Sequence, residues 1–367
     1  AWVREAANAG MKYFVITAKH HDGFCLWPTK FSTYNVMDAT PFQRDILGEL
    51  AAACLKHGVK LGFYYSHWMD WDGSGGDVWI SEGWNAVSQQ RAPEYARPSQ
   101  AEFQSYWNHK CLLQISELID RYDPWLFWFE SWTNDINDYV TPQHQDELIE
   151  LVHGLSAKCL VNSRINFKAT SDKCDFLSMM DNNFPDTGFA KPWETSGTLN
   201  HSWGYHACDY GWRSTQQLLK NLIGNAALGG NYQLNVGPMG TGAFQPAAIK
   251  RLREIGCWLA VNGESIYGTQ GSPIGQMPWG RITRRSLPDG NTRLYLHLWN
   301  VTPALLVPGL AGIPGSAKVL ESGQPVLVEA GKEGLWVNVP IELRDVELPV
   351  IALDIKVNSW GPLGKAN

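Results

Sequence analysis

Tyr13-Phe-Val-Ile-Thr-Ala-Lys-His-His-Asp-Gly-Phe24 is the stretch that decides the fold, because an apolar run ends abruptly in four polar residues, Lys19 to Asp22. A near-continuous apolar run is typical of a strand covered on both faces, as in a parallel α/β sheet. In barrels built from such strands, side chains at the carboxyl ends of the strands carry the chemistry. The sequence therefore indicates His20 and His21 as site candidates first and as core residues second.

Strand-like and helix-like patterns alternate up to about residue 270, which is typical of repeated βα units around a parallel sheet. Predicted strands include 13–17, 59–66, 125–129, 160–163, 175–180 and 232–236, and predicted helices are 44–56, 98–121, 142–158, 214–222 and 246–261. About seven strand candidates are present, where a closed barrel has eight. We therefore predict an α/β fold, a (β/α)8 TIM-like barrel over residues 1–270 that lacks its N-terminal strand.

The sequence pattern changes from about Gly271, after which no stretch shows the spacing of apolar residues that is typical of a helix. Short alternating runs at 292–299, 317–320 and 334–339 are separated by turns rich in Pro and Gly. This pattern predicts a small all-β sandwich domain over residues 271–367.

Composition excludes several classes of function. The net charge of -6 comes with no basic block, which argues against a nucleic-acid partner. No run of 18 or more apolar residues is present, so no membrane span is predicted. The seven Cys form no C-x-x-C pair, which favours neither a zinc motif nor a disulfide framework. The chain opens on Ala1-Trp-Val-Arg without Met or a signal-like segment, so we expect that a native N-terminal region has been lost.

Tryptophan is unusually abundant, with 18 in 367 residues. Several lie beside polar residues, as in Trp68-Met-Asp-Trp71, Trp128-Phe-Glu-Ser-Trp132 and His201-Ser-Trp203-Gly-Tyr205. Sugar rings have apolar C–H faces edged with hydroxyls, so a sugar site needs aromatic platforms among hydrogen-bonding groups. Core packing explains many of these residues, but their clustering at strand ends favours a carbohydrate site.

Two carboxylates follow predicted strands. Glu130 comes after five apolar residues, and Asp181 follows another strand candidate. Such a pair fits glycoside hydrolysis, in which one carboxylate attacks the anomeric carbon and the other protonates the leaving oxygen without a metal. Other interpretations stay open: Glu130 as a solvated loop residue, Asp181 as a turn former and Arg164 as a plain salt-bridge partner.

Several segments, taken together and in order, resemble glycoside hydrolase family 29, the α-L-fucosidases. The resemblance extends from residue 1 to about residue 270. The segments that carry it are Ala18-Lys-His-His-Asp-Gly-Phe-Cys-Leu-Trp27, Leu61-Gly-Phe-Tyr-Tyr-Ser66, Trp128-Phe-Glu-Ser-Trp132, Trp193-Glu-Thr195, Ser202-Trp-Gly-Tyr205, Gly229-Gly-Asn-Tyr-Gln-Leu-Asn-Val-Gly-Pro238 and Val261-Asn-Gly-Glu-Ser-Ile-Tyr-Gly-Thr269.

The resemblance implies a retaining exo-glycosidase that removes terminal α-L-fucose from a glycan through a covalent glycosyl-enzyme intermediate, with no cofactor and no metal. Its nucleophile position is Glu130, and alignment on Pro185 puts the acid/base at Asp181. A secreted or periplasmic location is also favoured by resemblance. The implied sugar-binding residues are His20, His21, Trp27, Tyr64, Arg164 and Trp203.

Two departures from the family pattern affect these expectations. The family's nucleophile is an Asp, and Glu130 adds one methylene, which moves the carboxylate forward by about 1.5 Å, a displacement large enough to affect the rate. The family's first strand also carries a His-Trp-Gly segment, which no residue before Tyr13 matches.

Three alternatives follow. The same mechanism can act on α-L-galactosides or α-L-glucosides. A decayed enzyme scaffold can serve as a carbohydrate-binding protein. A metal-dependent hydrolase that uses His20, His21 and Asp22 would lose activity with a chelator, but no third ligand at an informative spacing supports it. The loop from Trp68 to Pro98 is expected to border the leaving group.

Overall fold

The computed structural model describes residues 1–367 except 73–74, 77–96, 132–136, 167–172, 311–313 and 357–367. Two compact units are present. The first contains residues 1–7 and 11–178, and the second contains residues 8–10 and 179–367. In the part of the chain that is described, no helix is both long and apolar enough to cross a bilayer.

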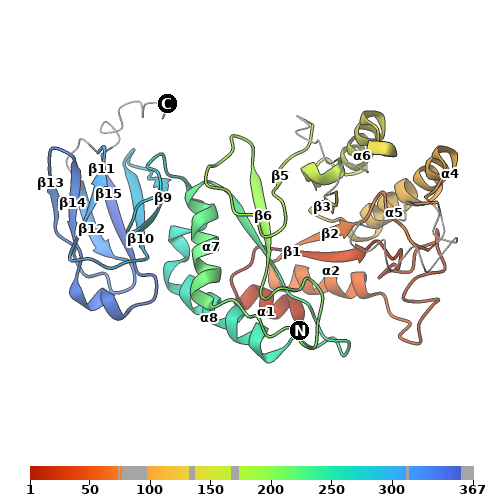
Figure 1. Ribbon diagram of the computed structural model, residues 1–367, viewed down its shortest axis with the longest axis horizontal. Helices are drawn as coiled ribbons and strands as arrows, with labels where there is room; N and C mark the ends of the chain where they lie inside the picture. Colours follow the sequence, from red (N-terminus) through yellow and green to blue (C-terminus); the bar gives the residue numbers. More distant parts are fainter. Residues whose placement is uncertain (73–74, 77–96, 132–136, 167–172, 311–313, 357–367) are drawn as a thin grey trace. The chain divides into compact units, whose positions relative to one another are not determined.

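A four-stranded parallel sheet organises the first unit, in the order β1-β2-β3-β4. Its strands are β1 (Tyr13–Lys19), β2 (Lys60–Tyr65), β3 (Leu126–Phe129) and β4 (Leu160–Val161), and Figure 1 shows β1, β2 and β3 running side by side. Each overlaps a strand predicted from its apolar run, so the prediction of a parallel α/β sheet is confirmed here. A further short strand, β5 (Leu177–Ser178), lies within the predicted strand 175–180.

Helices of the first unit are α1 (Trp2–Asn8), α2 (Ile46–His57), α4 (Gln100–Tyr106), α5 (Leu112–Tyr122) and α6 (Pro142–Leu155). Their ends carry the expected caps: Asp45, Ser99 and Thr141 accept backbone N–H groups at three N-termini, and Gly58 adopts a left-handed conformation (φ 67°) after α2. The single helix predicted over 98–121 is interrupted by a π-turn at Trp107–Cys111. The five residues of this turn shift the helical register without ending the helix.

The two faces of the sheet have different neighbours. Phe63 and Phe127 point to the face covered by helices, where they share a core with residues such as Leu118 of α5. Tyr64 and Trp128 alternate with them and point to the opposite face, in a separate and smaller apolar cluster. The strand period of two therefore divides core residues from residues that are available to a site.

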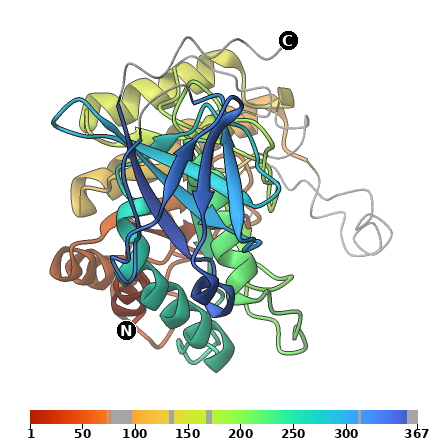
Figure 2. The same ribbon diagram turned by 90° about the vertical axis from the view of Figure 1, so that its left-hand side faces the viewer.

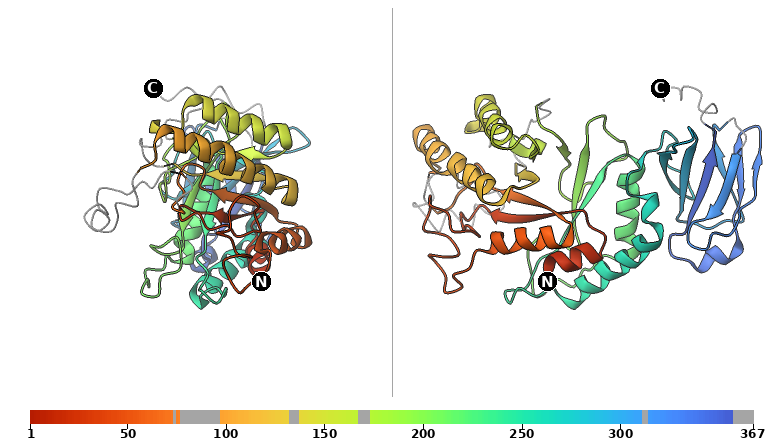
Figure 3. Two further views of the ribbon diagram at one scale, coloured as in Figure 1. Left: turned by 90° about the vertical axis from the view of Figure 1, so that its right-hand side faces the viewer. Right: turned by 180° about the vertical axis from the view of Figure 1, so that it is seen from behind.

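The second unit begins with two parallel strands, β6 (Trp193–Thr198) and β7 (Asn231–Asn235). Helices α7 (Thr215–Ala227) and α8 (Pro246–Asn262) share one apolar core, and Figure 3 shows them side by side. All six residues of β6 are buried although most are polar. The sequence did not indicate this strand because Trp-Glu-Thr-Ser-Gly-Thr has neither an apolar run nor an apolar alternation.

Two antiparallel sheets follow, in the orders β12-β15-β10-β9-β8 and β11-β14-β13. Figure 2 views the molecule from the side on which these sheets lie. Apolar side chains from both sheets, among them Leu296 and Val337, form one core. The prediction of a small all-β region is confirmed. The strands are β8 (Gln270–Gly271), β9 (Gly280–Ser286), β10 (Thr292–Leu298), β11 (Ala304–Pro308), β12 (Pro314–Val319), β13 (Val328–Ala330), β14 (Gly334–Asn338) and β15 (Val350–Ile355).

A buried histidine in this region makes stability depend on pH. The Thr283 hydroxyl donates to the Ser265 carbonyl (2.6 Å), so it accepts from Nε2–H of His297 at 3.1 Å. Burial lowers the pKa of His297 to about 3. In the unfolded chain, His297 binds a proton near pH 6.5. The stability that the neutral, buried His297 contributes is therefore fully present above that pH and is lost as the pH falls toward 3.

We expect His297 to contribute about 2 kcal/mol to the loss of unfolding free energy between pH 6.5 and pH 5. Urea unfolding of the wild-type chain and of His297→Phe at pH 7, 6 and 5 measures this contribution. The variant is expected to lose stability less steeply with acid. Parallel pH dependences in the two proteins would contradict the assignment.

Candidate active site

A β-bulge at the end of β1 sets the direction in which the chain presents the side chains that follow, among them His20 and His21. Thr17 pairs with Tyr64 and Lys19 with Tyr65, so one extra residue is accommodated between the two pairs. Lys19 consequently points toward Tyr106 on the helix-covered side of the sheet. His20 lies on the other side, where its ring stacks on Tyr64.

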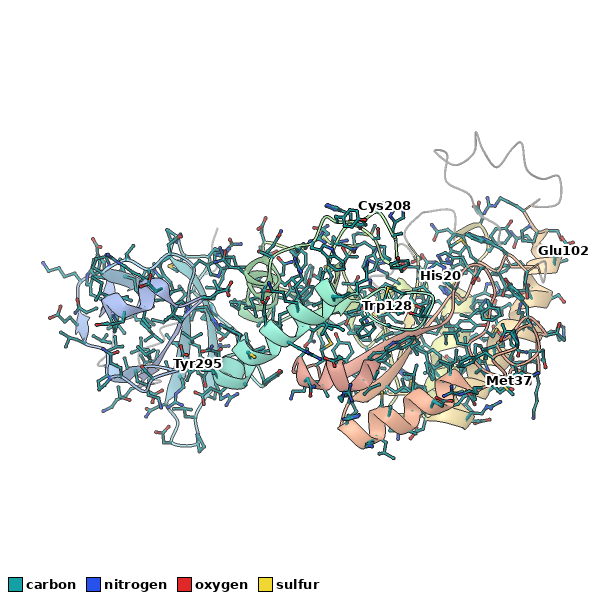
Figure 4. The ribbon with its side chains drawn as sticks, turned by 90° about the horizontal axis from the view of Figure 1, so that it is seen from below. His20, Met37, Glu102, Trp128, Cys208 and Tyr295 are labelled. Carbon is teal, nitrogen blue, oxygen red and sulfur yellow. The ribbon has the colours of Figure 1, made fainter. Side chains whose placement is uncertain are left out.

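Aromatic and cationic groups form a row across the carboxyl ends of the strands. The His20 and Tyr64 ring centroids are 5.2 Å apart with an interplanar angle of 7°, and those of Tyr64 and Trp128 are 5.5 Å apart at 19°. The Arg164 guanidinium lies 4.8 Å from the Trp128 ring centroid. Figure 4 labels the two rings His20 and Trp128 of this row.

Glu130 is held at the end of β3 by both its side chain and its main chain. Arg164 Nη1 donates to Glu130 Oε1 at 2.5 Å, and both side chains are largely buried. The indole Nε1 of Trp68 donates to the Glu130 carbonyl at 2.9 Å. Burying a charged carboxylate costs free energy unless a cation is paired with it. The ion pair with Arg164 therefore allows Glu130 to be charged at the carboxyl end of β3.

His21 is fixed through the loop that follows β2. Ser66 Oγ donates to the Met69 carbonyl (2.9 Å), so it accepts from Nδ1–H of His21 at 2.7 Å, which sets the tautomer of the ring. Burial, followed by repulsion from His20 when that ring is protonated and from the positive charge of Lys19, holds the pKa of His21 well below its usual value. Burial also lowers the pKa of His20. Both rings are therefore neutral at neutral pH and act as hydrogen-bonding groups.

A buried ion cluster behind the site was not indicated by the sequence. Lys19 Nζ donates to Asp70 Oδ2 at 2.6 Å and to the Tyr106 hydroxyl at 2.9 Å, and neither Lys19 nor Asp70 is exposed. Lys110 contacts Asp70 at 3.0 Å and also binds Asp72. Burial alone would raise the pKa of Asp70, but Lys19 and the other partners more than offset this and lower it. The cluster fixes the residue that directly precedes His20.

Trp27 has a different environment from the other predicted sugar contacts. Its side chain is fully buried in the main core, and Nε1 donates to Glu117 Oε2 at 2.8 Å. A ligand cannot reach a ring in this position. We therefore assign Trp27 to the support of the segment that follows His21, and not to direct contact with a sugar.

Asp181 and Trp203 belong to the second unit. Asp181 is exposed in the turn after β5, next to Asn182, which has a left-handed backbone (φ 53°) and accepts the Thr198 N–H at 3.0 Å. Trp203 is 39% exposed, and its carbonyl accepts from Asn235 Nδ2 at 2.6 Å. Both side chains thus stand on loops whose backbones are fixed by side-chain hydrogen bonds.

The remaining predictions concern metal binding and the loop after β2. No group of three or more His, Cys, Asp or Glu among the described residues is arranged to hold a metal ion. All seven cysteines are free thiols, and five of them are buried. Most of the loop predicted to border the leaving group, Trp68 to Pro98, lies outside the described residues.

A charged carboxylate, an arginine and neutral histidines set on an aromatic row are the groups with which a glycoside hydrolase binds and cleaves a sugar. The sequence profile described as alpha-L-fucosidase matches residues 1–264. The chain belongs to the α-L-fucosidase family, glycoside hydrolase family 29.

Individual relatives agree with this membership. The chain is 25% identical to an α-L-fucosidase of Dictyostelium discoideum over 355 residues, which is 93% of this chain and 72% of the relative. It is 28% identical to the tissue α-L-fucosidase of Bos taurus, of which it spans only 54%. The α-L-fucosidase isoenzyme 1 of Paenibacillus thiaminolyticus superimposes with a TM-score of 0.82 at 28% identity, over 97% of this chain and 86% of that one.

One solved relative bears on reaction chemistry. A family 29 α-L-fucosidase of Bacteroides thetaiotaomicron, trapped as a covalent intermediate with 2-fluoro-fucosyl fluoride, has a TM-score of 0.79 and 26% identity to this chain. The match covers 97% of this chain and 80% of that enzyme.

Proposed function

We propose that this protein is a retaining α-L-fucosidase that releases terminal α-L-fucose from glycans. The observation that carries the proposal is the 2.5 Å ion pair between Glu130 and Arg164 at the end of a strand lined with aromatic rings. Family membership and the covalent intermediate of the Bacteroides relative support the same chemistry.

In the first step, Glu130 attacks the anomeric carbon and forms a glycosyl ester, while Asp181 gives its proton to the departing glycosidic oxygen. In the second step, Asp181 takes a proton from water, which attacks the same carbon and releases Glu130. The two inversions leave the anomeric configuration unchanged. Arg164 holds the Glu130 carboxylate in its charged and aligned state before the first attack, and it stabilises the negative charge that returns to this carboxylate when water releases it in the second step.

Sugar recognition is proposed for His20, His21, Tyr64, Arg164 and Trp203. The neutral imidazoles of His20 and His21 can bond to hydroxyl groups, and the rings of Tyr64 and Trp203 suit the apolar side of the sugar. Fucose has a methyl group at C6 where L-galactose has a hydroxymethyl group. An apolar pocket rejects an added hydroxyl by only about 100-fold, so α-L-galactosides are the runner-up substrates.

The proposed architecture is a (β/α)8-type barrel over residues 1–270 followed by a β-sandwich over residues 271–367. The superposition on the Paenibacillus enzyme over 97% of this chain supports it. In this arrangement the row from His20 to Arg164 stands at the carboxyl ends of the barrel strands, where enzymes of this fold place their active sites.

Release of nitrophenol from the 4-nitrophenyl α-L-fucoside, α-L-galactoside and α-L-glucoside tests the proposal, with the β-D-fucoside as a control. We expect turnover of the α-L-fucoside above all others and none of the control. Binding of fucose without any turnover would instead establish a carbohydrate-binding protein on the same scaffold.

Asp181→Asn is expected to reduce hydrolysis of a fucosylated oligosaccharide by about 10²- to 10⁴-fold, because the alcohol leaving group needs a proton. Formation of the glycosyl ester from the nitrophenyl fucoside depends much less on protonation of the leaving group, since nitrophenolate is a stable anion. Measuring kcat/KM on both substrates gives the comparison.

Asp186→Asn is the matched control and should retain both activities. Asp186 is a carboxylate of the same segment of the chain, and its Oδ1 accepts from Gln276 Nε2 at 3.3 Å. Equal losses of Asp181→Asn on the two substrates would contradict the assigned role.

A further inference from the structure

His67 links the two segments that carry the Glu130–Arg164 pair. Its Nε2 lies 2.8 Å from the Ile165 carbonyl, directly after Arg164 in the chain. Its ring meets Phe129, directly before Glu130, edge to face, with centroids 5.2 Å apart and an interplanar angle of 68°. The ring is fully buried. One side chain therefore contacts both neighbours of the ion pair.

The tautomer and the protonation state of the His67 ring are both determined by its surroundings. A carbonyl can only accept a hydrogen bond, so Nε2 of His67 carries the proton. Burial lowers the pKa of His67 to about 3, although the bond to Ile165 opposes this shift. The imidazole is thus a neutral, permanent donor over the pH range in which a glycosidase works.

The segment that bears Arg164 has little regular structure of its own. The strand before it, β4, is two residues long, and Ser163–Ile165 is a single 3-10 turn with Arg164 at φ -81° and ψ 20°. Side-chain bonds hold this turn: Ser163 Oγ accepts the Ser178 N–H at 3.1 Å, and the Ile165 carbonyl accepts from His67. The placement of the guanidinium therefore depends on two groups outside the turn, the Ser178 backbone N–H and the His67 imidazole.

We propose that His67 is a positioning residue that sets the alignment of Arg164 with Glu130, and so governs the charge and direction of the nucleophile. The assignment rests on the proposed function. It gives a specific role to His67, which is not among the catalytic and sugar-binding residues that the family resemblance implies.

The chain offers a matched control. His297 is also fully buried, its pKa is also lowered to about 3, and it also donates through Nε2, but to Thr283 in the antiparallel sheet. His67→Phe and His297→Phe both remove a buried donor and retain an aromatic ring. His67→Gln keeps an N–H that can reach the Ile165 carbonyl.

For His67→Phe we expect kcat to fall on the order of 10- to 100-fold, the cost of displacing a reacting group by about 1 Å. Because Arg164 then holds Glu130 less closely, the acid limb of kcat/KM against pH should move upward by about one pH unit. His67→Gln should recover most of the rate and the wild-type acid limb. His297→Phe should change neither quantity.

Hydrogen exchange provides a readout that does not need turnover. Peptides that contain residues 162–166 and 129–131 should exchange faster in His67→Phe than in His297→Phe. If Phe cannot be accommodated at 67, His67→Asn, whose amide is too short to reach Ile165, replaces it in both experiments.

Unchanged kcat, acid limb and local exchange in the His67 variant, or equal changes in His297→Phe, would overturn the assignment. A wild-type chain without turnover would overturn the proposed function alone. In that case the exchange comparison still decides the role of His67.

Discussion

Glu130→Gln is expected to lower kcat on 4-nitrophenyl α-L-fucoside by about 10⁵- to 10⁶-fold, the scale found when a covalent nucleophile is removed. The amide is nearly isosteric with the carboxylate but cannot form the glycosyl ester. It also carries no charge for Arg164, whose Nη1 lies 2.5 Å from Glu130 Oε1 in the wild-type chain. Steady-state kinetics, with fucose binding measured by calorimetry, separates loss of chemistry from loss of affinity.

Glu117→Gln is the matched control for this substitution. Glu117 is a buried carboxylate of the same unit that accepts from Trp27 Nε1 at 2.8 Å and from the Lys30 N–H at 3.2 Å. Its amide variant should keep kcat within a few fold and lose only stability. Substantial turnover by Glu130→Gln would show that another group attacks the sugar.

Lys19→Met is expected to lower the free energy of unfolding by about 3–5 kcal/mol, the cost of breaking a buried ion pair and leaving one charge behind. Among the residues that the structure describes, Lys110 would remain as the one cationic partner of Asp70, which is not exposed. The Met side chain fills most of the volume of Lys, so the loss reflects charge more than packing. Urea unfolding at pH 7 measures it.

Lys158→Met serves as the control, because Lys158 pairs with Asp123 at 2.5 Å on the surface, where both side chains are more than 60% exposed. Pairs of this kind contribute about 0–1 kcal/mol. A similar small loss for Lys19→Met would mean that the buried cluster does not stabilise the end of β1.

Local sequence patterns predicted most of the first sheet. The strands β1, β2 and β3 are apolar runs that end in polar residues, which is the pattern expected for strands of a parallel α/β sheet. The strand β6 escaped detection because it is polar yet fully buried. Its place comes from backbone pairing with β7, which leaves no periodic signal in the sequence.

Candidate site residues at strand ends could also be predicted, since Glu130 directly follows an apolar run and His20 belongs to the polar group in which another apolar run ends. Their partners could not. The pairing of Arg164 with Glu130 and the contact of Lys19 with Asp70 join residues 34 and 51 positions apart. The burial of Trp27 likewise follows from α5, which supplies Glu117, and not from its neighbours in the chain.

Trapping the intermediate tests the central claim most directly. The chain is incubated with 2-fluoro-fucosyl fluoride, digested and mapped by mass spectrometry, with Glu130→Gln treated in parallel. The account predicts one 2-fluorofucosyl group per chain, attached to Glu130, and none on the variant. A stable adduct on a different carboxylate, or turnover of α-L-fucoside without any trapped ester, would contradict it.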